Sequence, residues 1–443
     1  MKVRKKLQSI HKPEYNPSMK KLQAFKFELM PTAEQELNMR KFAGSCRFVF
    51  NKALAWQKAE YARDNETPMS YATWANMLPT WKQNATLAWL TQSPAQILQQ
   101  SLKDLERAYK NFFNNTADFP NFKKKSGSAS FRYPQGFKLD EPNARIFLPK
   151  LGFMRYRKSR KIGLNENIVA KNVTISFKAG KWFASIQTEQ AEIVQIEEPK
   201  KSVGIDMGCV RFATLSDGSY IEPCNFKKHE QRLKKYQRRM SRKVKFSKNW
   251  YKEKAKVQKA NAKIANVRND FIHKVTTDIA KNHEMVFIED LQVKKMTKSL
   301  AGSTATPVVK IKKRNLNRSI LNQGWHEFAR QMAYKMAWVG GVFLKVPAYY
   351  TSLTCPVPTC QNIDKKNRKT QALFKCVACG YEDNADLVGA INVKSRGHRD
   401  WSEMQKLDQA CGGKKDKKPS IPRSMKVEQK QEPAKALEEE IPL

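Results

Sequence analysis

Three carboxylates stand where a folded chain could gather them around metal ions. Asp206 ends one apolar strand pattern and Glu289 ends a second, while Asp386 lies among small and apolar residues that predict a helix packed closely on a sheet. Two Mg²⁺ ions roughly 4 Å apart, held by such carboxylates, activate water and support the leaving oxygen in phosphodiester hydrolysis. The pattern therefore predicts a metal-dependent nuclease.

Each of these acids also has an ordinary explanation. A strand that ends in Gly-Ile-Asp, as at Asp206, occurs in actin-like ATPases too. An acid at a strand end is often only a helix cap or a salt-bridge partner. The three acids together, with a cysteine cluster between the second and the third, are more specific than any one of them.

The cysteine cluster has the spacing of a zinc site. Four residues separate Cys355 from Cys360, two separate Cys376 from Cys379, and fifteen lie between the pairs. Two tight turns could present two thiolates each to one tetrahedral zinc, and a site closed by four sulfurs is structural. The other four cysteines are scattered, so we expect metal binding rather than disulfides, in a zinc ribbon of two hairpins.

The charge balance points to a polyanionic partner. The 443 residues include 83 Lys and Arg against 41 Asp and Glu, a net charge of +42. A basic protein without such a partner, or one that binds membrane surfaces, is the alternative. Residues 227–256 hold fourteen Lys or Arg against two Glu, which predicts a basic helix that contacts nucleic acid. Its candidate contact residues are Lys234, Lys235, Arg238, Arg239 and Arg242.

Further elements would position these side chains. We expect a strand at Leu22–Leu29, followed by helices through residue 113. Alternating apolar and polar residues over 130–190 predict a small antiparallel barrel, and the strand at Leu22–Leu29 is a candidate member of it. Residues 191–199 read as a linker. We expect a second helix to pair with the basic helix, a mobile loop over 292–314, a helix over about 320–339, a strand over 341–346 and disorder from about residue 412 onward.

No run of apolar residues is long enough for a membrane span, and the basic start leads into no signal-peptide pattern. We therefore expect a cytoplasmic protein, associated with the bacterial nucleoid.

Several motifs in this order carry a family resemblance. They are Gly204-Ile205-Asp206-Met207-Gly208, Ala213 to Gly218, Ile288-Glu289-Asp290-Leu291, Gln323-Gly324-Trp325, the four cysteines, and Cys379-Gly380-Tyr381 to Asn392. The sequence resembles the TnpB (OrfB) family of transposon-encoded RNA-guided DNA endonucleases, relatives of type V CRISPR effectors. The match covers about residues 200–397, and Phe25–Pro31 with Arg47–Asn51 resembles the amino-terminal region of the family.

The resemblance implies a multidomain α/β protein. It would combine a RuvC/RNase H-like nuclease domain holding an inserted zinc ribbon with an antiparallel β-barrel wedge and a helical recognition lobe. The implied domains are a basic amino terminus with the first wedge strand (1–30), the recognition lobe (31–125), the wedge (126–196), the first nuclease part (197–350), the ribbon (351–381), the last nuclease part (382–400) and a disordered tail (401–443).

The resemblance also implies partners and roles. A guide RNA from the transposon end would pair with one strand of double-stranded target DNA beside a short flanking motif. Asp206, Glu289 and Asp386 would hold two catalytic Mg²⁺ ions, and the four cysteines one structural Zn²⁺. Arg368 resembles the ribbon arginine that reaches the active site, although an exposed phosphate-binding arginine is an equal alternative.

Two other functions stay open. The first is an RNA-guided DNA-binding repressor that does not cut, although such proteins normally lose active-site acids. The second is a transposase or its accessory protein. Against it, the six histidines are dispersed, so no tyrosine nucleophile with a paired-histidine metal motif is visible.

Overall fold

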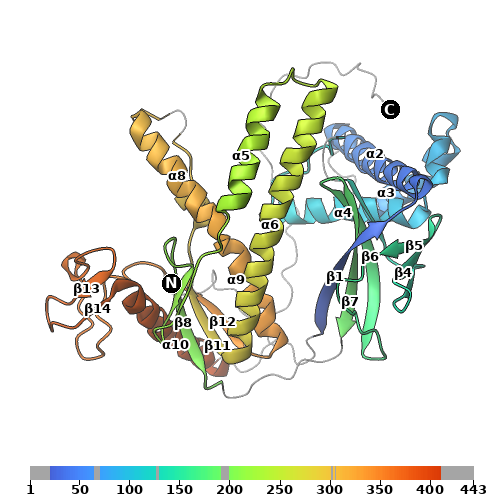
Figure 1. Cartoon of the computed structure of the whole chain (residues 1–443). Coiled ribbons are helices and arrows are strands. Elements are labelled where there is room, and N and C mark those ends of the chain that lie inside the picture. The colour runs from blue at the N-terminus through green and yellow to red at the C-terminus, as the bar shows by residue number, and fades with distance from the viewer. Residues whose placement is uncertain are drawn as a thin grey trace. The chain divides into compact units, whose positions relative to one another are not determined.

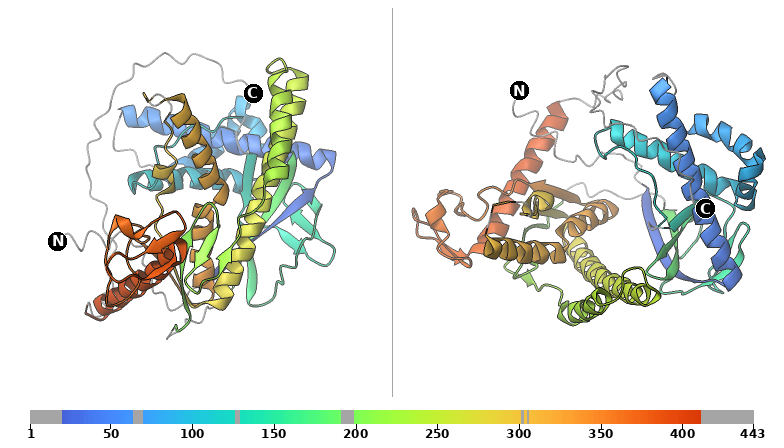
Figure 2. Two further views of the ribbon diagram at one scale, coloured as in Figure 1. Left: turned by 60° about the vertical axis from the view of Figure 1, so that its left-hand side comes forward. Right: turned by 90° about the horizontal axis from the view of Figure 1, so that it is seen from above.

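The computed structural model describes residues 20–63, 70–125, 129–190, 199–300, 303–304 and 306–410, and the statements below concern these residues. The chain divides into two compact units, residues 1–397 and 398–443. Figures 1 and 2 show the arrangement of the elements. Within the described residues, no helix is long and apolar enough to cross a membrane.

The amino-terminal part contains a seven-stranded antiparallel sheet in the order β2-β6-β7-β1-β5-β4-β3. The strand predicted at Leu22–Leu29 is β1, and it does join this sheet by pairing with β7 and β5. The predicted small antiparallel barrel is thus a sheet with β2 and β3 at its two edges, and in the described residues these two strands are not paired with each other. The strands are β1 (Lys21–Met30), β2 (Ala129–Tyr133), β3 (Lys138–Asp140), β4 (Arg145–Leu148), β5 (Gly152–Tyr156), β6 (Ile168–Lys178) and β7 (Lys181–Gln190).

Helices in this part share a hydrophobic core with the sheet. They are α2 (Ala33–Arg63), α3 (Tyr71–Gln83), the 3-10 helix η1 (Ala85–Gln92), which was not predicted, and α4 (Ala95–Phe113), which ends at the residue where the predicted helical patterns end. Large side chains such as Trp74, Tyr109 and Phe27 are fully buried in this core. The indole nitrogen of Trp74 donates to the buried Gln57 side chain at 3.0 Å, so these two polar groups are paired inside the core.

The carboxyl-terminal part is built on a five-stranded sheet in the order β10-β9-β8-β11-β12. Strands β8, β11 and β12 are parallel, and β9 and β10 form a hairpin around Asp217-Gly218. The apolar runs become buried parallel strands because both of their faces are covered. The strands are β8 (Ser202–Met207), β9 (Ala213–Leu215), β10 (Tyr220–Ile221), β11 (Met285–Glu289) and β12 (Val342–Val346).

Two long antiparallel helices form the predicted basic hairpin, clearly visible in Figure 1. They are α5 (Lys227–Ser241) and α6 (Lys248–Asn282). The turn between them, residues 242–247, interrupts the stretch that was predicted as one basic helix. Ser247 caps α6 by accepting a hydrogen bond from the backbone N–H of Trp250 at 3.2 Å, which explains why a new helix starts there.

The predicted mobile loop over 292–314 is partly wrong. It contains α7 (Val293–Met296), and its end belongs to α8 (Pro307–Gln323). Thr306 caps α8 and Pro307 occupies its first turn, two start signals that the basic composition concealed. Gly324, at φ +73°, then ends α8 and begins α9 (Trp325–Trp338), where one continuous helix had been predicted.

The ribbon contains η2 (Lys365–Asn367) and a hairpin of β13 (Leu373–Lys375) with β14 (Glu382–Asn384), after which α10 (Ala385–Ala410) begins. Because α10 continues to Ala410, the disordered tail predicted from residue 401 is wrong for residues 401–410. Its remainder, and residues 191–198 of the predicted linker, lie outside the described residues.

Glycines let α10 lie directly against the sheet. A Cβ atom on Gly204 of β8 would lie 2.2 Å from the carbonyl oxygen of Ala390. A Cβ atom on Gly397 would lie 2.1 Å from the ring of Phe287 in β11. These close approaches fix the start of α10, and with it Asp386, beside the two strands that end in acids.

Candidate active site and metal centre

The fold brings the three predicted acids to one end of the five-stranded sheet. Ile205 of β8 is paired with Ile288 of β11 in parallel register, so Asp206 and Glu289 follow on adjacent strands at the same edge. Asp386 lies in the first turn of α10. One turn further along, a Cβ atom on Gly389 would lie only 3.1 Å from Oδ2 of Asp206.

The carboxylates repel one another electrostatically. Burial, and then the charges of Glu289 and Asp386, raise the pKa of Asp206 to about 7, while Arg368 acts in the opposite direction. Burial also raises the pKa of Glu289, although a hydrogen bond from Thr351 and the charges of Arg396 and Arg368 oppose the shift. A site that disfavours its own negative charge in this way is suited to a cation.

Carboxylate oxygens are the ligands that Mg²⁺ prefers, so the donor set fits that ion. Among the described residues, the four cysteines are the group whose potential ligand atoms lie close enough together for a single metal ion.

Arg368 points from the ribbon to this site. Its guanidinium lies 3.7 Å from Oδ1 of Asp386. Asn367, which is fully buried, holds the preceding turn by donating to the carbonyls of Leu353 and Asn362 and accepting from the N–H of Val377 at 2.9 Å. The ribbon therefore presents an ordered cation to the carboxylates.

Two buried polar residues that the sequence analysis missed orient Glu289. The hydroxyl of Thr351 donates to Oε1 of Glu289. The side-chain amide of Asn392 donates to the carbonyls of Thr351 and Thr354, at 2.8 and 2.7 Å. Asn392 is the last residue of the motif that begins at Cys379, and nothing in the sequence signals its contact with residues some forty positions earlier.

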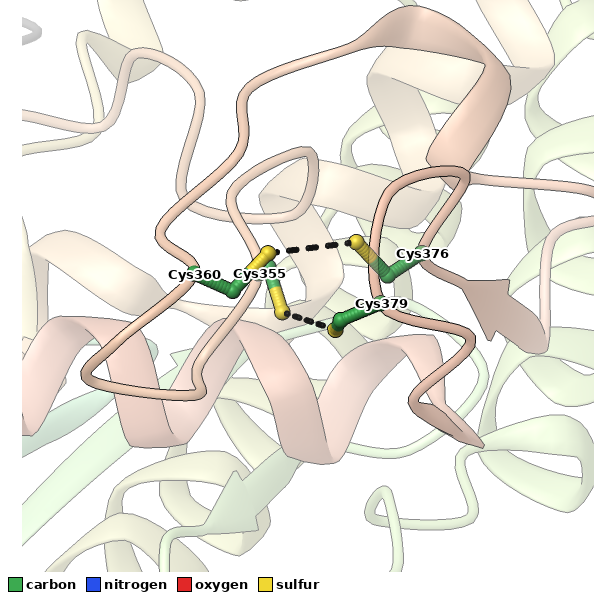
Figure 3. A group of neighbouring side chains, drawn as sticks. All are labelled: Cys355, Cys360, Cys376 and Cys379. Carbon is green, nitrogen blue, oxygen red and sulfur yellow. Dashed lines mark hydrogen bonds between the residues drawn. The ribbon is translucent and has the colours of Figure 1, made fainter.

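The four predicted zinc ligands meet in the ribbon, as Figure 3 shows. Their potential ligand atoms all lie within 4.8 Å of one another. The sulfurs of Cys355 and Cys379 are 3.6 Å apart, and those of Cys360 and Cys376 are 3.7 Å apart. A tetrahedral zinc with bonds of about 2.3 Å would separate its sulfurs by about 3.8 Å, so the geometry fits Zn²⁺.

The second ribbon turn favours a thiolate at Cys376, whereas burial raises the pKa of Cys355 in the first. Burial alone would raise the pKa of Cys376, but the backbone N–H groups of Cys379 and Ala378 and the neighbouring thiols lower it to about 6. The second turn belongs to the β13–β14 hairpin, and the first is held by a bond from Cys355 N–H to the carbonyl of Asn362 at 2.9 Å. Four cysteines that lie together in this way could bind zinc.

The predicted nucleic-acid contacts lie on α5 and just after it. This helix has no buried residue along its whole length. Arg238 and Arg239 lie in its last turn, and Arg242 is its C-cap residue. The structure thus leaves Lys234, Lys235 and these three arginines accessible to a partner.

Three family models match the chain. Residues 185–300 match a family described as "Probable transposase", residues 325–393 a "Cas12f1-like, TNB domain", and residues 19–66 a "Helix-turn-helix domain". Of the described residues in the last range, 21–30 form the strand β1 and 33–63 the helix α2.

Relatives match nearly the whole chain. A protein of Escherichia coli (strain K12) named "Putative RNA-guided DNA endonuclease InsQ" is 52% identical over 382 residues, which cover 86% of this chain and 93% of the relative. A "Putative RNA-guided DNA endonuclease" of Streptomyces pristinaespiralis is 31% identical over 84% of this chain and 89% of its own. Among solved structures, a Cas12f1–sgRNA–target DNA complex aligns at 12% identity with a TM-score of 0.46, covering 86% of this chain and 99% of that one.

Proposed function

The chain belongs to the TnpB (OrfB) family, and we propose that it is an RNA-guided DNA endonuclease that cuts with Asp206, Glu289 and Asp386. The observation that carries this proposal is the parallel register of β8 and β11, which makes the first two acids neighbours on adjacent strands. The packing of α10 against β8 adds the third. Acids that served only as helix caps would not need to lie together, whereas these three come from separate elements to one edge of the sheet.

Two Mg²⁺ ions bound by these carboxylates would supply an activated water and support for the leaving oxygen. The chain's own side chains have complementary roles. Thr351 favours the ionised form of Glu289 through its hydrogen bond. Arg368 would stabilise the negative charge that develops on the phosphate. The four cysteines would bind a structural Zn²⁺ that maintains the ribbon and thereby the position of Arg368.

The partners would be a guide RNA from the transposon end and double-stranded DNA. The net charge of +42 supports this, because holding two nucleic acids requires many phosphate contacts. The basic face of α5, with Lys234, Lys235, Arg238, Arg239 and Arg242, would supply some of them. Base pairing by the guide would then select the sequence to be cut. We also propose that the domain ranges derived from the family hold for this chain.

Plasmid cleavage tests the proposal. The protein is co-expressed with its native flanking DNA, the RNA that copurifies is sequenced, and a plasmid with the matching target is incubated with the complex in Mg²⁺. The native chain should linearise the plasmid and Asp206→Ala should not. Asp270→Asn is a matched control, because Asp270 is an exposed acid that pairs with Lys274 on the surface of α6.

Each alternative has its own outcome. Target binding without cutting by the native chain would replace the proposal with an RNA-guided repressor. Undiminished cutting by Asp206→Ala would remove these acids from the reaction. Heterogeneous copurifying RNA, or none, would remove the guide and return the chain to the generic RuvC-like nucleases.

A further inference from the structure

The turn between α5 and α6 and the start of α6 carry a group of aromatic side chains, Phe246, Trp250 and Tyr251, which we call the aromatic tip. Their rings contact one another edge to face, with centroids 5.5 Å apart for Phe246 and Trp250 and 5.2 Å apart for Trp250 and Tyr251. Nevertheless Phe246 is 62% exposed and Tyr251 is 51% exposed. Rings that served only to hold the turn together would bury more of this surface.

The backbone holds the aromatic tip in a defined conformation. Phe246 has φ +70°, a left-handed conformation that residues with a side chain rarely adopt. On either side of it, the N–H of Ser247 donates to the carbonyl of Val244 at 3.1 Å, and the N–H of Tyr251 donates to the carbonyl of Ser247 at 3.0 Å. The backbone that carries the exposed rings therefore has a defined conformation before any partner arrives.

Cations surround the rings. The ammonium group of Lys245 lies 5.0 Å from the ring centre of Phe246, and that of Lys254 lies 4.9 Å from the ring centre of Trp250. Glu253 is the single acid among residues 242–256, and it forms an ion pair with Lys256 at 2.6 Å. The other cations in this range are Arg242, Lys243, Lys248 and Lys252. Such a surface attracts polyanions.

Rings and cations together select the kind of polyanion. Phosphates satisfy the lysines, and a nucleobase can stack on an exposed ring, but the base faces inside a duplex are already covered. Unpaired RNA, whose splayed bases stack on aromatic side chains, matches both features. Figure 1 shows the tip at the end of the hairpin remote from the five-stranded sheet, so this surface is separate from the nuclease site.

We propose that the aromatic tip binds an unpaired segment of RNA, with a base stacked on Phe246 or Tyr251 and the flanking phosphates on the neighbouring lysines. This inference rests on the proposed function for the choice of RNA over single-stranded DNA, since bases of either strand could stack on the rings, and for identifying that RNA as the guide. It adds to the proposed function a specific recognition surface for a loop or single strand, beyond the general phosphate contacts of α5.

Binding of short probes to the full chain tests the inference. The probes are a single-stranded RNA of 12 nucleotides, a blunt RNA duplex of the same length and a single-stranded DNA of the same length. The double variant Phe246→Leu/Tyr251→Leu keeps apolar side chains but removes the stacking faces. It should bind single-stranded RNA about tenfold more weakly. Its affinity for the duplex should not change.

Salt dependence separates stacking from charge. The leucine variant should keep the native slope of log affinity against log salt, whereas Lys248→Gln/Lys252→Gln should flatten it. The variant Phe246→Trp/Tyr251→Trp should retain native affinity, and Phe153→Leu, which replaces an exposed ring on β5, is the matched control. Equal thermal melting of the leucine variant and the native chain would exclude unfolding.

Three results would overturn the proposal: no loss of single-stranded RNA binding, an equal loss for the duplex, or an equal loss for single-stranded DNA. All binding is measured without added Mg²⁺, so that no DNA or RNA is cut during the measurement. A chain that shows the expected pattern but cuts no DNA would therefore contradict only the proposed function.

Discussion

The guanidinium of Arg368, in the ribbon, lies 3.7 Å from the carboxylate of Asp386, on the helix that follows the ribbon. The side chains are 25% and 33% exposed, so the pair is open to a substrate as well as to solvent. This ion pair connects the cysteine ribbon to the carboxylate cluster, and it makes the role of Arg368 testable.

Replacing Arg368 with alanine should slow DNA cleavage by roughly 100-fold, because the variant lacks a positioned charge that stabilises the transition state. Arg368→Lys should recover part of the rate, since it keeps the charge but lacks the fork of donors. The measurement is the single-turnover cleavage rate at saturating guide RNA. Lys369→Ala is the control for the neighbouring exposed cation. Equal rates for native protein and Arg368→Ala would mean that the ion pair is only structural.

Thr351 should act as a positioning residue through Glu289. Thr351→Val keeps the shape of the side chain but removes the hydroxyl, and this leaves the pKa of Glu289 higher, because the missing hydrogen bond favoured the ionised form. We expect cleavage to fall about tenfold at neutral pH and the acidic limb of the pH–rate profile to move to higher pH. Thr351→Ser should restore both. A uniform decrease at every pH would point to a distorted fold instead.

The raised pKa of Asp206 predicts a cost to stability when no metal is bound. Burial and the neighbouring acids raise this pKa to about 7 from the ordinary 3.8, so the folded chain holds a proton that the unfolded chain has released. The free energy of unfolding should therefore fall as pH rises from about 4 to about 7. In EDTA at pH 8, Asp206→Asn should melt a few degrees higher than the native chain.

The pH dependence provides the control for that experiment. At pH 4 the melting temperatures of the two proteins should converge, because the native carboxyl is then protonated when folded and about half protonated when unfolded. Saturating Mg²⁺ should raise the melting temperature of the native chain and leave that of Asp206→Asn less affected. A variant that melts below the native chain in EDTA at pH 8 would contradict the prediction.

Zinc analysis tests the ribbon. The purified chain should contain about one zinc per molecule, and Cys376→Ser should reduce both this content and cleavage, because the variant lacks a ligand and Arg368 no longer has an ordered position. Cys209→Ser is the control, since Cys209 lies outside the cluster. Full cleavage by a zinc-free chain would show that zinc in the ribbon is not needed for the reaction.

The basic face of α5 should govern the salt dependence of binding. Arg238→Gln/Arg239→Gln removes two charges from a helix without buried residues, so the fold should persist. The slope of log affinity against log salt should flatten by roughly 0.7–0.9 for each phosphate that the variant no longer neutralises. Removing two cations from α6, in Lys274→Gln/Lys281→Gln, should change the slope less. Equal slopes for both pairs would leave only a general effect of net charge.

Sequence patterns predicted the helices and strands in which apolar residues recur at a regular spacing. They missed the interactions between residues that are far apart in the sequence. The strands before Asp206 and Glu289 were predictable because each is a short apolar run that ends in an acid. In α8, basic residues and exposed apolar residues alternate without a clear buried stripe, and the helix start went unrecognised.

Long-range hydrogen bonds explain the rest of what was missed. The placement of Thr351 against Glu289 depends on β12 and the loop after it, and the placement of Asn392 depends on how α10 meets that loop. Neither interaction has a local signature in the sequence. Arg368 could be assigned from the family resemblance, but its distance from Asp386 required the folded ribbon.

Gly389 affects how easily a descendant of this protein could lose DNA cleavage during evolution. A single methyl group there would lie 3.1 Å from the Asp206 carboxylate, which would have to move by a few tenths of an ångström, while alanine favours the helix itself. A descendant could thus lose cutting and keep binding with all three acids still in its sequence. Among relatives, intact acids alone are therefore insufficient to identify an active nuclease, and the residue that faces them from α10 must be read as well.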